Sequence, residues 1–117
     1  MAFTHRDALV ALYNATDGAN WGHKTNWNTD AHLSLWDGIK VDYQDRVVEL
    51  CLTYNNLRGS IPKELGSLSK LETLSLRNNN LTGPIPKELG ALSKLKMLNL
   101  SLNKLTGGMV GDGRSGF

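Results

Sequence analysis

The sequence predicts an α/β solenoid, in which the chain coils repeatedly and each turn of the coil contains one short strand. The first observation is the pattern (Val/Leu)-x-x-Leu-x-Leu-x-x-Asn-x-Leu-x-Gly, which recurs with a step of 24 residues at Asn55, Asn79 and Asn103. The second is the Leu-x-Leu core of each copy, because a period of two is typical of a half-buried strand. The third is the Ile-Pro that follows in two copies, where Pro62 and Pro86 suit the start of a short helical stretch.

The repeats occupy the middle of the chain and need cover at both ends. Residues 47–106 carry the pattern, which divides into repeats 47–70 and 71–94 and the partial repeat 95–106. One repeat buries too little apolar surface to fold alone, so neighbours must stack on it and caps must cover the ends. Residues 1–46 are the predicted N-terminal cap. The Gly-rich tail 107–117 lacks the pattern, and we predict that it is mobile.

The cap is predicted to begin with a helix over residues 4–14. Thr4 suits the N-cap position, and Asp7 three residues later completes a capping box. Leu9 and Leu12 fall on one face at helical spacing, so this face is expected to enter the core.

The rest of the cap is predicted to hold aromatic residues and a hairpin. Trp21, Trp27 and Trp36 lie in an irregular stretch, and we interpret them as a small core, with a ligand-stacking site as the alternative. Residues 39–41 and 47–50 flank a polar turn, a pattern that predicts a hairpin at the start of the sheet.

Composition predicts neither a nucleic-acid partner nor a membrane-spanning segment. The formal net charge of +2 is too small to indicate nucleic-acid binding. No window approaches the roughly 20 apolar residues needed to cross a bilayer. The N-terminus lacks the apolar core of a signal peptide, so we expect an intracellular, cytoplasmic location if Met1 is the true start. A secreted or cell-surface location is the alternative.

The sequence offers no set of residues for catalysis or metal binding. His5, His23 and His32 show no metal-ligand spacing, so we expect no metal and no cofactor. Cys51 is the single cysteine and cannot form an intrachain disulfide. The repeats contain no histidine to activate it. We therefore expect no catalytic residue and no enzymatic activity.

The pattern, with its Gly-x-Ile-Pro segment, resembles the plant-type leucine-rich repeat over residues 47–107. The segments Asp7-Ala8-Leu9-x-x-Leu12-Tyr13, Asn26-Trp27-Asn28 and Trp36-x-Gly38-Ile39 resemble the N-terminal cap of such proteins. The fuller cap text, over residues 14–21, is most similar to leucine-rich-repeat proteins of algae and related protists. The resemblance implies a right-handed coil with a curved parallel sheet on the concave side and an α-helical N-terminal cap.

One departure from the secreted plant relatives concerns the compartment. In those relatives the cap carries a cysteine pair, whereas Leu35 and Val41 stand in the corresponding places here. This difference favours a reducing compartment.

The resemblance also implies recognition of a protein, peptide or glycan, as in receptor ectodomains, inhibitor proteins and the repeat arms of signalling proteins. Side chains between the leucines point away from the core and form the predicted contact face: Glu49, Thr53, Tyr54, Thr73, Ser75, Arg77, Asn78, Met97, Asn99, Ser101 and Leu102. Tyr54, Arg77 and Leu102 are expected to contribute most to binding. Asn55, Asn79 and Asn103 are expected to stack into a ladder that satisfies backbone groups in the turns.

The leading prediction is a non-catalytic recognition module that binds a protein or peptide through the concave strand face. Two alternatives stay open. One is a secreted or surface receptor-like or inhibitor fragment that recognises a glycan or an enzyme. The other is a structural repeat fragment that self-associates through its uncapped C-terminal end.

Overall fold

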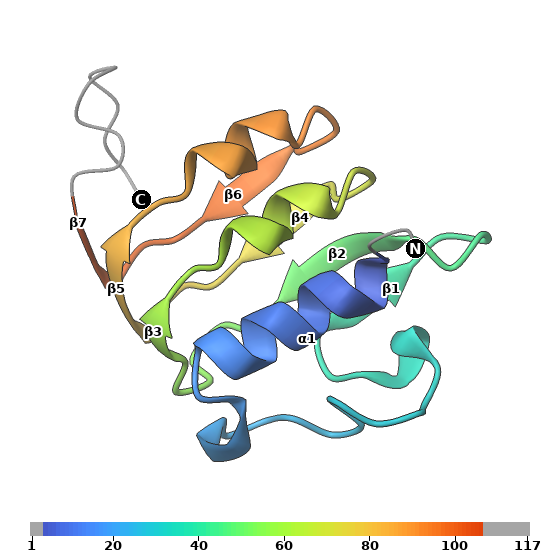
Figure 1. Ribbon diagram of the computed structural model, residues 1–117, viewed down its shortest axis with the longest axis horizontal. Helices are drawn as coiled ribbons and strands as arrows, with labels where there is room; N and C mark the ends of the chain where they lie inside the picture. The colour runs from blue at the N-terminus through green and yellow to red at the C-terminus, as the bar shows by residue number, and fades with distance from the viewer. Residues whose placement is uncertain (1–3, 107–117) are drawn as a thin grey trace.

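The computed structural model describes residues 4–106 as a solenoid of short coils that begins with a helical cap (Figure 1). The predicted fold class is confirmed. The elements follow one another as α1 (His5–Ala15), η1 (Gly18–Asn20), η2 (Leu33–Leu35), β1 (Ile39–Val41), β2 (Val47–Cys51), β3 (Arg58–Ser60), η3 (Lys63–Ser67), β4 (Thr73–Ser75), β5 (Asn80–Pro84), η4 (Lys87–Ala91), β6 (Met97–Asn99) and β7 (Lys104–Thr106), where η marks a 3-10 helix. The predicted mobile tail, 107–117, lies outside the described residues.

The strands form two sheets. In the first, of order β1-β2-β4-β6, strands β2, β4 and β6 are parallel and β1 pairs antiparallel with β2 as the predicted hairpin. The second, of order β3-β5-β7, is wholly parallel. The sequence does not predict this sheet, because each of its strands is short and holds too few apolar residues to show a period of two.

The core lies between the first sheet and the helices. Figure 1 shows α1, η3 and η4 side by side over one face of β2, β4 and β6, and contacts join α1 to η3 and η3 to η4. Leu50 and Leu74 are fully buried in this layer, whereas Leu98, their equivalent in the third coil, is only partly buried. The opposite face of the first sheet is left without a helix among the described residues.

The predicted helix and its capping box are confirmed. The Thr4 hydroxyl accepts the N–H of Asp7 at 3.1 Å, and the N–H of Thr4 donates to Asp7 Oδ2 at 2.8 Å. Leu9 and Leu12 are fully buried, as their spacing predicts. The helix is thus fixed at its start and docked by its apolar face.

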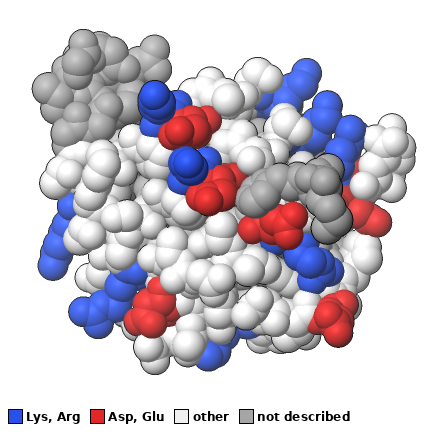
Figure 2. Space-filling model, in the orientation of Figure 1, with Lys and Arg blue, Asp and Glu red and all other residues white. Residues whose placement is uncertain are grey.

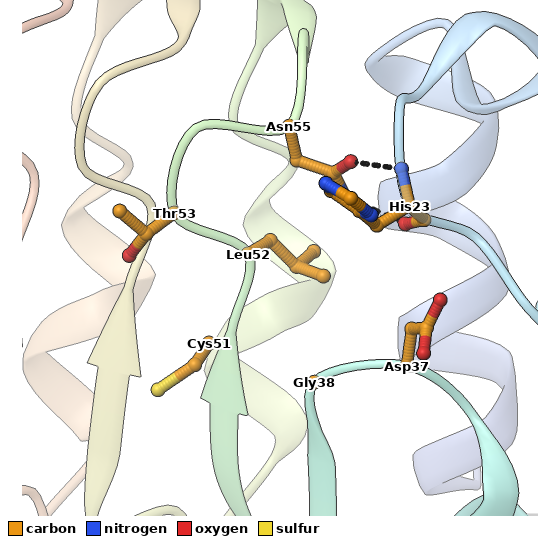
Figure 3. Close-up of a pocket in the computed structure, with 7 residues that line it drawn as sticks. All are labelled: His23, Asp37, Gly38, Cys51, Leu52, Thr53 and Asn55. Carbon is orange, nitrogen blue, oxygen red and sulfur yellow. Dashed lines mark hydrogen bonds between the residues drawn. The ribbon is translucent and has the colours of Figure 1, made fainter.

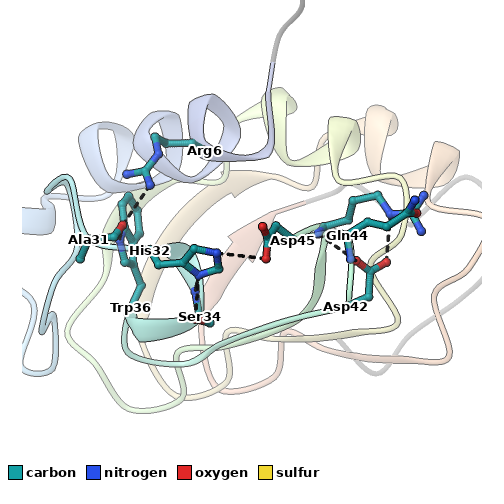
Figure 4. A network of polar contacts seen from close by, with 9 residues as sticks. Arg6, Ala31, His32, Ser34, Trp36, Asp42, Gln44 and Asp45 are labelled. Atoms are coloured by element: carbon teal, nitrogen blue, oxygen red, sulfur yellow. Dashed lines mark hydrogen bonds and ion pairs between the residues drawn. The ribbon is translucent and has the colours of Figure 1, made fainter.

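The interpretation of the tryptophans as core residues is confirmed. Trp21, Trp27 and Trp36 are at most 4% exposed, and successive ring centroids lie 4.7 and 5.0 Å apart. Each indole N–H donates to a backbone carbonyl. The Arg6 guanidinium lies 5.2 Å from the centre of the Trp36 ring and donates to the Ala31 carbonyl at 2.9 Å (Figure 4). Arg6 therefore links α1 to the segment that contains Ala31 and Trp36.

The three repeat asparagines lie in successive coils and bond the backbone across them. Asn79 Oδ1 accepts the N–H groups of Asn55 and Leu57 at 2.9 and 3.0 Å, and its Nδ2 donates to carbonyls of its own and the preceding coil at 2.9 Å. Asn103 makes similar bonds one coil later. Asn55 in turn bonds the N–H and carbonyl of His23, so the row of amides continues into the cap.

Gly66 and Gly90 occupy the same place in consecutive coils, but their surroundings differ. A Cβ on Gly66 would lie 2.6 Å from the carbonyl oxygen of Glu88 in the next coil, and backbone atoms cannot move aside cheaply. A Cβ on Gly90 meets no described atom within 4 Å.

We expect Gly66→Ala to lower the free energy of unfolding by about 1–3 kcal/mol, because the added methyl forces two coils apart. Gly90→Ala is the matched control and should leave stability unchanged or slightly higher, since alanine restricts the unfolded chain. Urea unfolding followed by circular dichroism measures both. Equal destabilisation by the two changes would contradict the close contact between coils.

His5 links α1 to the hairpin. Its Nδ1 accepts the N–H of Val47 at 2.9 Å, which requires a neutral ring with its proton on Nε2. Burial lowers the pKa of His5 below its ordinary 6.5; Asp42 opposes this shift and Arg46 adds to it.

Since the pKa of His5 is lower in the folded chain, the unfolded chain binds the proton first as the pH falls. The contribution of His5 to stability is therefore complete above about pH 6.5 and is lost as the pH drops from 6.5 through the lowered value. We expect the urea midpoint to fall across this window. His5→Asn keeps an acceptor near Val47 without titrating, so its midpoint should fall less; an identical profile would rule out His5 as the cause.

Candidate functional site

The helix-free face of the first sheet carries the side chains that alternate with the buried leucines. Residues in register on neighbouring strands form two rows, namely Glu49, Thr73 and Met97, and Cys51, Ser75 and Asn99. Two further rows follow in the turns after the strands, namely Thr53, Arg77 and Ser101, and Tyr54, Asn78 and Leu102. We call these four rows the concave face. It contains every residue predicted for contact.

Large apolar side chains of the concave face are exposed to solvent. Tyr54 is 74% exposed, Leu102 58% and Met97 46%. Tyr54, Asn78 and Leu102 have φ angles of 54°, 61° and 57°, in the left-handed region that residues other than glycine and asparagine seldom adopt. Each coil therefore turns in the same way after its strand and holds one side chain at the rim.

The centre of the concave face differs from its rim. Ser75 is only 6% exposed, and its hydroxyl lies 2.9 Å from that of Thr53. Asn99 Oδ1 accepts the N–H and the hydroxyl of Ser101 at 3.1 and 2.6 Å. Small, mutually bonded polar groups thus form the floor, and the larger side chains stand around them.

The cap adds residues to this face that sequence analysis did not assign to it. Lys40 of β1 is in register with Glu49, and their charged groups lie 3.8 Å apart. His23 and Asp37 line a pocket of about 220 Å³ together with Cys51 of β2 (Figure 3). The place of Lys40 follows from alternation in the predicted hairpin. His23 and Asp37 lie in irregular segments, where no periodicity indicates their direction.

A second pocket, of about 490 Å³, adjoins the first and shares His23 and Asn55 with it. Its wall includes the exposed Tyr54 and the amides of Asn78 and Asn80. Neutral amides can both donate and accept hydrogen bonds, which suits the backbone of a bound peptide. The two pockets lie next to each other between the cap and the first two repeats.

Cys51 is half-buried, and its sulfur is directed away from His23 and Asp37 (Figure 3). Burial raises its pKa, and the charge of Glu49 adds to the shift. Since the thiolate is the reactive form, the thiol is held in its inert state at neutral pH.

His32 lies between a carboxylate and a hydroxyl. Its Nε2 is 3.0 Å from Asp45 Oδ1, and its Nδ1 is 2.7 Å from the Ser34 hydroxyl (Figure 4). The N–H of Ser34 also donates to Nδ1, so the imidazole caps η2. We interpret this arrangement as a structural link between the cap and the hairpin turn.

Residues 4–106 lack two further features. The described chain holds no cluster of three or more histidine, cysteine, aspartate or glutamate residues placed to bind a metal ion. Within the same residues, no helix is both long enough and apolar enough to cross a membrane.

The profile of the family described as "Leucine rich repeat" matches residues 45–105. The chain belongs to the leucine-rich-repeat family. Over 80 residues it is 36% identical to a probable leucine-rich repeat receptor-like protein kinase of Arabidopsis thaliana, a match that covers 58% of this chain and 8% of the kinase. The leucine-rich repeats are of the plant type, as predicted.

Solved leucine-rich-repeat structures have the same fold. The ectodomain of the Arabidopsis thaliana receptor kinase GASSHO1/SCHENGEN3, in complex with CASPARIAN STRIP INTEGRITY FACTOR 2, superposes with a TM-score of 0.79 and 34% identity over 89% of this chain and 13% of that one. The Arabidopsis HAESA ectodomain, in complex with an IDA peptide hormone ligand, gives 0.67 and 28% over 90% of this chain and 18% of that one. The chain spans less than a fifth of each of these relatives. They lend no support to the expected intracellular location.

We expect iodoacetamide to alkylate Cys51 several-fold more slowly in the folded protein than in the same protein unfolded in urea, because burial keeps the thiol protonated and shielded. Mass spectrometry of timed samples at neutral pH gives the two rates. Equal rates would show that the thiol is not shielded in the folded chain and that its pKa is not raised. The alkylation rate of glutathione, measured in urea and in buffer, corrects for the effect of urea on the reaction itself.

Proposed function

We propose that this chain is a non-catalytic recognition module that binds a protein or peptide segment laid across the concave face. The observation that carries the proposal is the row of rim side chains, in which Tyr54, Asn78 and Leu102 follow successive strands in the same backbone conformation. An aromatic ring and an aliphatic side chain exposed on one face, beside a pocket lined by amides, combine anchors with hydrogen-bonding groups.

The relatives support this proposal. The solved structures of GASSHO1/SCHENGEN3 and HAESA hold a named factor and a peptide hormone, respectively. Both similarities cover about nine-tenths of this chain and exceed 25% identity. We therefore propose the same class of ligand here, without extending to this chain the identity of either ligand.

The dimensions of the concave face limit the ligand. Strands of one sheet lie about 4.8 Å apart, so the four strands from β1 to β6 span roughly 14 Å. An extended peptide advances about 3.3 Å per residue, so roughly four residues can lie across these strands. Such a contact is far smaller than a standard protein interface of about 800 Å² per partner. We expect the affinity of this chain alone to be modest.

The relatives support a secreted or cell-surface location, because they are named as receptor kinases and their ectodomains.

The self-association alternative is favoured by a different observation. Leu95, Leu98 and Leu105 of the third coil are partly exposed, whereas their equivalents in the second coil are fully buried. Light scattering at the concentrations of any binding assay distinguishes association between copies from ligand capture.

We expect the double change Tyr54→Ala and Arg77→Ala to reduce binding at least ten-fold while the melting temperature stays unchanged, because both side chains are exposed and anchor residues carry most of the binding energy. A panel of short synthetic peptides, screened by fluorescence anisotropy against the wild-type chain, supplies the ligand. Lys63→Ala with Lys87→Ala is the control, since these lysines lie on the helix-bearing side. Unchanged binding by the first pair, or equal loss by the second, would overturn the concave face as the site.

A further inference from the structure

A groove at the edge of the first sheet, where β2, β4 and β6 begin, collects basic side chains. Its volume is about 430 Å³, and its lining is Asp42, Arg46, Val48, Lys70, Glu72, Lys94 and Lys96. Figure 2 shows Lys and Arg side chains gathered along the edge near the loops that lead into β4 and β6 in Figure 1, with both signs mixed over the helix-covered face. We call this feature the basic groove.

The repeat places the cations of the basic groove in register. Arg46, Lys70 and Lys94 are separated by the 24-residue step, so each occupies the same position in its coil. The coils are bonded to one another here, because the Lys96 N–H donates to the Glu72 carbonyl at 2.8 Å. With neighbouring strands about 4.8 Å apart, these positive charges form a short row across three coils.

The acidic side chains of the groove neutralise only part of this row. Arg46 Nε lies 2.9 Å from Asp42 Oδ2, and Lys96 Nζ lies 3.6 Å from Glu72 Oε1. Lys70 and Lys94 form no ion pair with any residue between 4 and 106. Four basic side chains against two acidic ones leave the groove with two positive charges in excess.

We infer that the basic groove binds an acidic polypeptide segment, whose carboxylates lie between Lys70 and Lys94. Neighbouring ammonium groups repel each other, and an anion placed between them is attracted to both, which offsets that repulsion. Asp42 and Glu72 pair with Arg46 and Lys96, which leaves the positive charge of Lys70 and Lys94, and so short a stretch suits a few acidic side chains better than the evenly spaced phosphates of a nucleic acid.

The inference goes beyond the proposed function and does not depend on it. The basic groove lies where the strands of the first sheet begin, whereas Tyr54 and Asn78 follow the ends of their strands. A substitution could therefore abolish binding at the basic groove and leave binding at the concave face intact, or the reverse.

Titration of the full ¹⁵N-labelled chain with hexaglutamate tests the inference. We expect saturable shifts of backbone signals over residues 46–48, 70–72 and 94–96, and affinity that weakens as NaCl rises from about 50 to 300 mM. Lys70→Gln with Lys94→Gln should weaken binding about five-fold or more, because each lost pair of exposed charges contributes a modest share. Tyr54→Ala should leave hexaglutamate binding unchanged, which separates this result from the proposed function.

The matched control is Lys63→Gln with Lys87→Gln, which removes the same charge from equivalent positions of η3 and η4. The inference is overturned if this control weakens binding as much as Lys70→Gln with Lys94→Gln, since the effect would then follow net charge alone. It is also overturned if shifts fall outside the groove, or if a single-stranded oligonucleotide of equal charge binds as tightly at the same salt. Melting curves of all variants establish that they are folded.

Discussion

The side-chain amide of Asn79 is the interaction on which the rest of this molecule depends. A leucine-rich coil turns sharply after each strand, and at that turn backbone groups leave the sheet while still buried. Asn79 accepts two backbone N–H groups of the preceding coil and donates to carbonyls on both sides. Without such an amide, several backbone groups would be buried unpaired, at a cost of about 1–3 kcal/mol each. The amide is therefore what allows an irregular turn to exist inside the core.

The same bonds determine where the contact residues lie. Because Asn55, Asn79 and Asn103 hold each turn in the same geometry, the residue before each asparagine takes a left-handed conformation and projects at the rim. The first of these asparagines bonds His23 rather than another repeat, so the cap is positioned by the same chemistry as a coil. The pockets between cap and repeats are consequences of that shared bonding.

Much of the fold was predictable because it follows from periodicity. The Leu-x-Leu cores predicted β2, β4 and β6, and the capping box at Thr4 predicted α1. The second sheet was not predictable in the same way, because its pairing arises from the stacking of coils that the first sheet aligns. Tertiary context, rather than local propensity, decides such short strands.

The candidate site was predictable in part for the same reason. Alternation assigned the repeat residues to one face, but it could not foresee that Ser75 would be buried by its neighbours. The contributions of His23 and Asp37 depend on how an irregular cap folds against the first strand. Their directions are set by contacts distant in sequence, such as the bond between Asn55 and His23, which no local pattern encodes.

The buried serine on β4 has a consequence for the shape of any occupant. The row of Cys51, Ser75 and Asn99, which crosses the three strands, is at most partly exposed, whereas Tyr54, Arg77 and Leu102 beyond the strand ends are exposed. A bound chain laid across the strands would place its main chain over this row and direct its side chains towards the exposed residues beside it. The exposed side chains would then determine which sequences bind, and the row of Cys51, Ser75 and Asn99 would accept many sequences alike.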